Sequence, residues 1–144
     1  MKPYLRLFTA LSISYVVMWA VMYSRVNEIG NVFLSLNQAY MAGLMVAPML
    51  VIMLLTMGSM YPNRKLNAAL LAGAVALFGV LWVLLRTQAG VGDRQFLRSM
   101  IPHHSAAILV CEQASLTDPR IRELCGQIIE SQRREIREMK SLMR

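Results

Sequence analysis

Three long apolar runs fill the first part of the chain, and an amphipathic pattern follows them. The runs cover residues 7–23, 40–60 and 66–85. The second and third carry no charge over about 20 positions, the length at which a helix crosses the hydrocarbon core of a bilayer. The first follows Lys2 and Arg6, as a signal peptide would, but it is long for a signal core and Tyr23-Ser-Arg is a poor cleavage site. We therefore expect three retained transmembrane helices.

From Asp93 onward, apolar residues recur at helical spacing, which predicts two helices separated by a break at residues 115–120. Asp118 can cap the second helix, and Pro119 loses no needed hydrogen bond at its first position. That helix should extend to about Leu142. The predicted fold is all-α, with a three-helix membrane anchor at residues 1–88 and an antiparallel helical hairpin at residues 89–144.

The hairpin geometry sets which residues face each other. Residues equidistant from Asp118 lie at similar depth, since each residue of both helices rises about 1.5 Å. Leu97, His104 and Cys111 are seven residues apart and form one stripe, and Cys125, Gln132 and Met139 form the facing stripe. Such a hairpin has an apolar side that it cannot bury alone, so we expect a second copy, as a homodimeric four-helix bundle, or the membrane helices to cover it. The facing pairs are Cys111 with Cys125, His104 with Gln132, and Leu97 with Met139.

Composition and charge placement agree with a membrane protein. Hydrophobic residues make up 56% of the chain, mean hydropathy is +0.46 and net charge is +7. No dense cationic run interleaved with aromatics is present, which argues against nucleic acid as a partner. Cations gather at the N-terminus and at residues 64–65, whereas the loop of residues 25–38 offers only Arg25. This bias predicts a cytoplasmic N-terminus and an extracytoplasmic hairpin, which in a bacterial inner membrane would be periplasmic.

The candidate chemistry gathers at the double histidine. His103 and His104 offer imidazole nitrogens, while Met100 and Met139 offer thioethers, soft ligands that suit Cu(I) or Ag(I). Near a helix start, the macrodipole disfavours imidazolium and keeps the ring available as a neutral ligand. The alternative is that the histidines are surface or interface residues, because adjacent side chains on a helix diverge by about 100°.

Cys111 and Cys125 allow three interpretations. An extracytoplasmic hairpin could be stapled by a disulfide between them. They could instead be soft metal ligands or two small buried hydrophobes.

Conventional enzyme chemistry is not indicated. The glutamates of the second helix alternate with arginines, as on a solvated face, and neither histidine follows a glutamate by three positions, which excludes a di-iron bundle. The sequence also lacks a nucleophile–base set and a phosphate-binding loop.

Residues 93–143 resemble a known family. Phe96-Leu-Arg-Ser-Met-Ile-Pro-His-His-Ser-Ala-Ala-Ile-Leu, Asp118-Pro, Ile128-Ile-Glu-Ser-Gln132 and Glu135-Ile-Arg-Glu-Met139 are similar to motifs of the "domain of unknown function 305" family. The resemblance implies a ferritin-like helical bundle built from one or two hairpins, and some secreted or periplasmic members bind copper or silver. The upstream anchor looks like that of a membrane-bound subgroup. The family pattern points to Met100, His103, His104, Gln132, Glu135 and Met139.

One departure from the pattern affects the expected site. Copper-binding relatives often add methionines after the double histidine, where this chain has Ala106 and Val110. Fewer sulfur ligands are therefore expected, and Cys111, one heptad from His104, could compensate.

Two functions follow. In the first, a dimeric, membrane-anchored bundle binds Cu(I) or a similar ion in metal homeostasis or resistance, with Gln132 and Glu135 orienting the imidazoles. In the second, the bundle is a membrane scaffold or accessory subunit that binds no metal.

Overall fold

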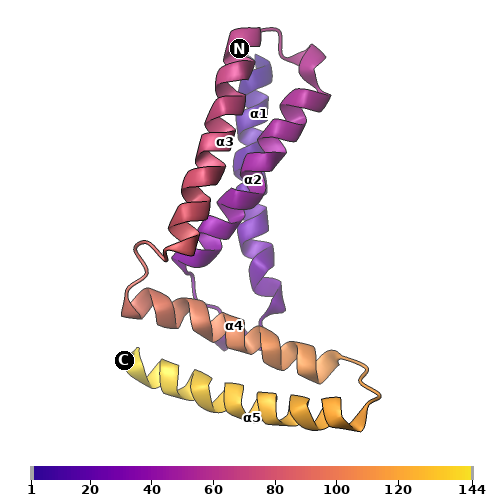
Figure 1. Cartoon of the computed structure of the whole chain (residues 1–144), viewed down its shortest axis with the longest axis vertical. Coiled ribbons are helices and arrows are strands. Elements are labelled where there is room, and N and C mark those ends of the chain that lie inside the picture. Colours follow the sequence, from indigo (N-terminus) through magenta and orange to yellow (C-terminus); the bar gives the residue numbers. More distant parts are fainter. Residues whose placement is uncertain (1, 144) are drawn as a thin grey trace. The chain divides into compact units, whose positions relative to one another are not determined.

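The structure, a computed structural model, describes residues 2–143, and within that range its regular elements are all helices, joined by short loops. The main helices are α1 (Lys2–Val21), α2 (Leu36–Thr56), α3 (Arg64–Arg86), α4 (Asp93–Gln113) and α5 (Pro119–Leu142) (Figure 1). Short 3-10 helices lie at η1 (Met22–Arg25), η2 (Ile29–Asn31) and η3 (Gly58–Met60). The predicted all-α class is confirmed, as are the three apolar helices followed by a helical pair.

Two compact units make up the chain. One contains α1 together with residues 37–89, and the other contains residues 22–36 together with residues 90–143. This division differs from the sequence-based one, which placed residues 22–36 with the membrane anchor. The loop between the first two apolar helices thus groups with the hairpin.

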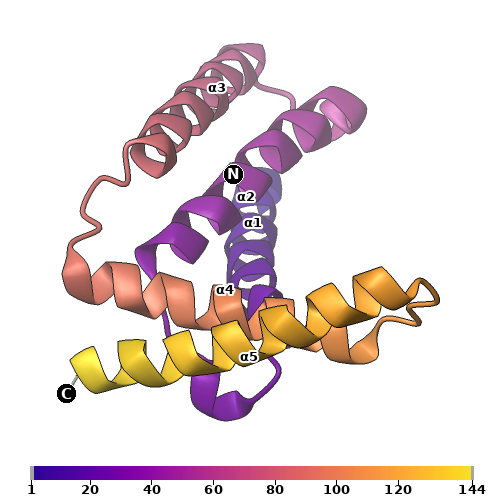
Figure 2. The same cartoon turned by 60° about the horizontal axis from the view of Figure 1, so that its bottom comes forward.

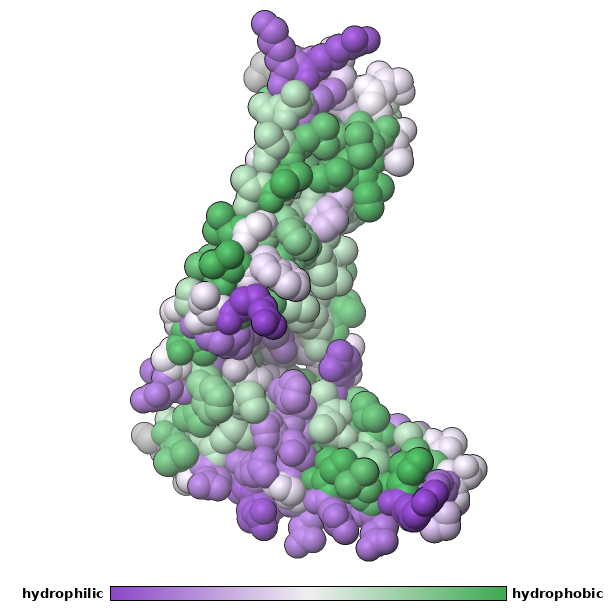
Figure 3. Space-filling view, viewed as in Figure 1, coloured by the Kyte–Doolittle hydropathy of each residue, from purple (hydrophilic) through white to green (hydrophobic). Residues whose placement is uncertain are grey.

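The first unit holds three helices that are long and apolar enough to cross a membrane. Between 6% and 22% of the apolar window of each helix is buried within the chain. The remaining apolar side chains face outward, as the hydrophobic surface over this unit shows (Figure 3). An apolar surface of this extent is stable in lipid rather than in water.

Contacts within the first unit gather where α1 begins, α2 ends and α3 begins. Leu7, Leu11, Leu54 and Tyr61 form its buried cluster. The Asn63 side chain caps α3 by accepting a hydrogen bond from the Leu66 amide at 3.0 Å. This end of the unit is therefore fixed by both packing and capping.

In the second unit, α4 and α5 lie side by side and antiparallel in both views (Figures 1 and 2). Ile101, Ile108, Ile136 and Met139 form the buried core between them. The predicted start of α5 is observed: the carboxylate of Asp118 accepts a hydrogen bond from the Arg120 amide at 2.8 Å, and proline occupies the first turn. The hairpin prediction is confirmed.

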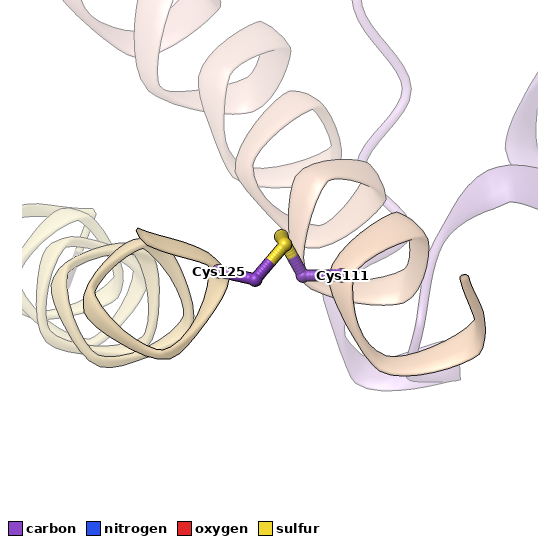
Figure 4. The surroundings of a disulfide bond; sticks show 2 residues. All are labelled: Cys111 and Cys125. Carbon is purple, nitrogen blue, oxygen red and sulfur yellow. A yellow bond between two sulfur atoms is a disulfide. The ribbon is translucent and has the colours of Figure 1, made fainter. Parts of the chain in front are cut away.

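A disulfide joins Cys111 of α4 to Cys125 of α5, with their Cα atoms 5.3 Å apart (Figure 4). The two residues were expected at equal depth, and the structure adds that their side chains face each other. Of the three interpretations the sequence left open, this is the staple. In this state neither sulfur is a thiolate, so neither is a metal ligand.

The loop of residues 22–36 covers part of the hairpin. Ser105 of α4 is fully buried, and its hydroxyl accepts a hydrogen bond from the Asn27 amide at 2.9 Å and donates to the Asn27 side chain. The side-chain amide of Asn31 also donates to this hydroxyl. Phe33 packs against the hairpin core. The sequence suggested a second copy or the membrane helices as cover, and it missed this loop.

The disulfide should stabilise the hairpin mainly by restricting its unfolded state. The cysteines are 14 positions apart, and closing a loop of that size contributes about 3 kcal/mol. Thermal unfolding of the full chain in detergent, followed by circular dichroism, should show a lower midpoint in reductant. The double variant Cys111→Ser/Cys125→Ser should start at that lower midpoint and not respond to reductant. An identical wild-type midpoint in both conditions would contradict this role.

Removing the Ser105 hydroxyl should loosen the loop from α4. Ser105→Ala removes the partner of the half-buried Asn27 backbone N–H, which costs about 1–3 kcal/mol of unfolding free energy. Ser99→Ala is the matched control, because that hydroxyl bonds only to the Phe96 carbonyl of its own helix. Hydrogen exchange at residues 22–36 should accelerate in the first variant alone. Equal exchange in both variants would show that Ser105 does not hold the loop.

Candidate functional site

His104 lies in the seam between α4 and α5 with a partner for each ring nitrogen. Its side chain is 10% exposed. Nδ1 is 2.8 Å from the Met100 carbonyl oxygen, and Nε2 is 2.7 Å from Oε2 of Glu135. A carbonyl oxygen only accepts, so Nδ1 carries a proton. The state of Nε2 then decides the chemistry: protonated, it completes an ion pair with Glu135; deprotonated, it presents a lone pair toward α5.

Glu135 is held from two sides and stays open to solvent. Ser131, one turn earlier on α5, donates its hydroxyl to Oε1 at 2.6 Å, while Oε2 faces His104. The hydrogen bond from Ser131 and then the one from His104 lower the pKa of the Glu135 carboxyl, against a smaller effect of desolvation; positive charge on His104 and Arg134 adds to the lowering. With 40% of its side chain exposed, Glu135 is an ionised carboxylate within reach of solutes.

The two predicted thioether residues meet in the hairpin core. Met139 is buried in the cluster of Ile101, Ile108 and Ile136, and Met100 packs against the same cluster. Met100 is also the residue whose carbonyl holds the His104 ring. The structure therefore places both methionines in one core and His104 between the Met100 carbonyl and Glu135.

The other predicted residues lie elsewhere. His103 is exposed, and its ring centroid is 6.0 Å from that of His104, with the ring planes at 66°. This divergence is what helical geometry demands of neighbours. Gln132 is half-buried, but the contact to His104 comes from Glu135, three residues farther along.

Ser131 is the residue that the sequence reasoning missed. Its signal was its position four residues before Glu135, which places both side chains on one helix face.

Within residues 2–143 no group of three or more His, Cys, Asp or Glu side chains is arranged to hold a metal ion. A metal site within the described part of one chain would therefore need other kinds of ligand in addition, such as thioether sulfur.

Comparison with known proteins assigns the chain to a family. Residues 82–143 match the "Domain of unknown function (DUF305)" family, and the chain belongs to it. It is also similar to "Uncharacterized protein L153" of Acanthamoeba polyphaga mimivirus, 36% identical over 138 residues, covering 94% of this chain and 85% of that protein. That similarity therefore includes the apolar helices as well as the hairpin. No solved structure matches the chain.

The lowered pKa of Glu135 predicts a loss of stability in acid. The folded state stabilises the ionised form of Glu135 relative to the unfolded state, in which the pKa of this carboxyl is near the ordinary 4.5. Its contribution is therefore complete above that value and disappears as the pH falls through the lower folded pKa. Unfolding followed between pH 6 and pH 3 should show this loss, and Glu135→Gln should flatten the profile.

Glu138→Gln is the control for that profile, because Glu138 is an exposed carboxylate on the same helix. It should leave the acid limb of the curve as in the wild type. Equal flattening in the two variants would mean that general charge, rather than the bonds from Ser131 and His104, sets the pH dependence.

Proposed function

We propose that the protein is a membrane-anchored metal-binding protein whose ferritin-like hairpin takes a soft ion, with Cu(I) or Ag(I) the best suited. The observation that carries the proposal is the hydrogen bond between His104 Nδ1 and the Met100 carbonyl. A metal-ligating histidine characteristically donates its other ring nitrogen to a carbonyl or carboxylate, which fixes the tautomer and aims the free lone pair. The bond thus prepares Nε2 as the ligand atom.

Metal binding at His104 Nε2 would replace the proton on that nitrogen with the metal ion. Nε2 faces an ionised carboxylate at 2.7 Å, so the position now suited to a shared proton is also suited to a cation. Because the neutral ring is the ligand, binding should weaken as the pH falls. Glu135 would orient the ring or contribute an oxygen.

The sulfur residues set the preference among ions. Thioethers favour soft Cu(I) and Ag(I) over Zn(II) or Mg(II). Met100 and Met139 both pack in the core between α4 and α5, and Met100 lies one turn before His104. His103, exposed beside His104, would add a nitrogen from the solvent side. Gln132 would be a further polar neighbour, while Cys111 and Cys125 serve as the staple.

The disulfide supports a location outside a reducing compartment, since such bonds persist in oxidising surroundings. We therefore propose that the hairpin faces the extracytoplasmic side of the membrane that the apolar helices cross. The relative reported above is viral and gives a bacterial inner membrane no support.

A second function, protein contact through the hairpin, is favoured by its exposed apolar side chains. Val110, Ile121 and Leu124, near the disulfide, are 64%, 48% and 54% exposed. Hydrophobic surface gathers toward the turn of the hairpin in Figure 3. A second copy of the chain could cover this surface and form the expected homodimer. Metal-free protein that dimerises through these residues would favour a scaffold role.

The metal proposal predicts stoichiometric Cu(I) binding by the full chain in detergent. Anaerobic titration against a chromophoric competitor should give about one ion per chain, and weaker binding at lower pH. His104→Ala should abolish binding, whereas Glu135→Gln should weaken it by about 10- to 100-fold, the usual effect of losing an orienting partner. Met100→Leu/Met139→Leu should reduce the preference for Cu(I) over Zn(II).

Met41→Leu/Met45→Leu is the matched sulfur control, because both residues lie on α2 in the other unit. It should leave Cu(I) affinity unchanged. Wild-type affinity in a helical, disulfide-bonded His104→Ala protein would contradict the site assignment. His104→Gln provides a second test should the alanine variant fold poorly.

A further inference from the structure

A polar cavity lies between the loop of residues 22–36 and α5. Its volume is about 350 Å³, and neither His104 nor Glu135 lines it. Asn27, Glu28 and Asn31 contribute from the loop, and Arg133, Arg137 and Lys140 contribute from α5. All of these residues belong to the same compact unit. The cavity is therefore separate from the candidate metal site.

Cationic side chains dominate this cavity. The three basic residues are spaced by four and three positions, which places them on one helix face. Arg133 directs Nη2 to Glu112 at 2.7 Å, and no ion pair engages Arg137 or Lys140 within residues 2–143. Against them the lining offers only one acid, Glu28. The excess positive charge suits an oxyanion.

Asn31 ties the loop side of the cavity together. It is 3% exposed, and its Nδ2 donates to Asn27 at 3.1 Å and to Ser105 at 3.4 Å. Its Oδ1 has less than 1 Å² of accessible surface, so it is not open to a ligand in the cavity. The cations of α5 are therefore the groups that a ligand would meet.

We propose that this cavity binds a phosphate group, with Arg137 and Lys140 holding the phosphate oxygens. Guanidinium and ammonium groups form strong, charge-assisted hydrogen bonds with phosphate. The phosphate belongs either to a lipid head group or to a free phosphate. The loop joins α1 directly to α2, two helices apolar enough to enter lipid, which makes a head group the expected source.

The test uses the full chain in detergent with a metal chelator present, so that its result is independent of the proposed metal site. Native mass spectrometry measures retention of phosphatidylglycerol, whose head group is anionic, against phosphatidylcholine, whose head group has no net charge. A parallel titration uses inorganic phosphate at constant ionic strength. The cavity variant is Arg137→Gln/Lys140→Gln, and the control is Arg94→Gln/Arg134→Gln, which removes two exposed cations that do not line the cavity.

Wild-type protein should retain phosphatidylglycerol over phosphatidylcholine, and the cavity variant should bind it at least about tenfold more weakly, the loss expected for two charge-assisted contacts. The control should bind as the wild type does. Binding of inorganic phosphate with the same loss in the cavity variant would support the site and identify free phosphate as its source. Equal retention of both lipids without phosphate binding, or equal weakening in both variants, would overturn the proposal. Circular dichroism confirms that both variants keep their helices.

Discussion

Burial of the His104 imidazole between two helices obliges each of its nitrogens to have a partner. One partner is local, since the Met100 carbonyl lies one turn back on α4. The other must come from across the seam, and Glu135 supplies it. That second contact requires the two helices to be held in one register. The capped turn at Asp118 and the disulfide supply this register, and the loop of residues 22–36 covers α4 at Ser105.

The same arrangement accounts for the differing surroundings of the two histidines. Helical geometry turns His103 to solvent while His104 enters the seam, so only one of them has its ring fixed by the fold. The exposed carboxylate of Glu135 connects this fixed ring to the outside. A buried nitrogen with a solvent-accessible acidic partner is suited to exchange a proton for another cation. The hairpin thus combines a disulfide-linked pair of helices with one contact, between His104 Nε2 and Glu135, that is suited to such an exchange.

Much of this fold was predictable because its determinants are local. The apolar runs and the Asp118-Pro119 cap specify helices from neighbouring residues alone, and equal spacing from the turn placed Cys111 level with Cys125. The loop was not predictable, because Asn27 and Ser105 are 78 positions apart and a single hydrogen-bonded pair leaves no periodic pattern. Equal spacing from the turn placed Gln132 level with His104, whereas Glu135, also predicted to orient the imidazoles, makes the contact. A shift of one or two residues at the turn moves the helices by about 3 Å, enough to change which of two side chains is reached.

The most direct measurement is nitrogen NMR of the imidazoles in the full chain, before and after addition of Ag(I) as a redox-stable substitute for Cu(I). The protein has only two histidines, so a His103→Gln variant assigns the His104 signals. If the fold prepares Nε2 as a ligand, Nδ1 of His104 remains protonated throughout, and the Nε2 resonance alone shifts on addition of one equivalent of Ag(I). Loss of the proton from Nδ1, or unchanged His104 signals in the presence of Ag(I), would contradict that assignment.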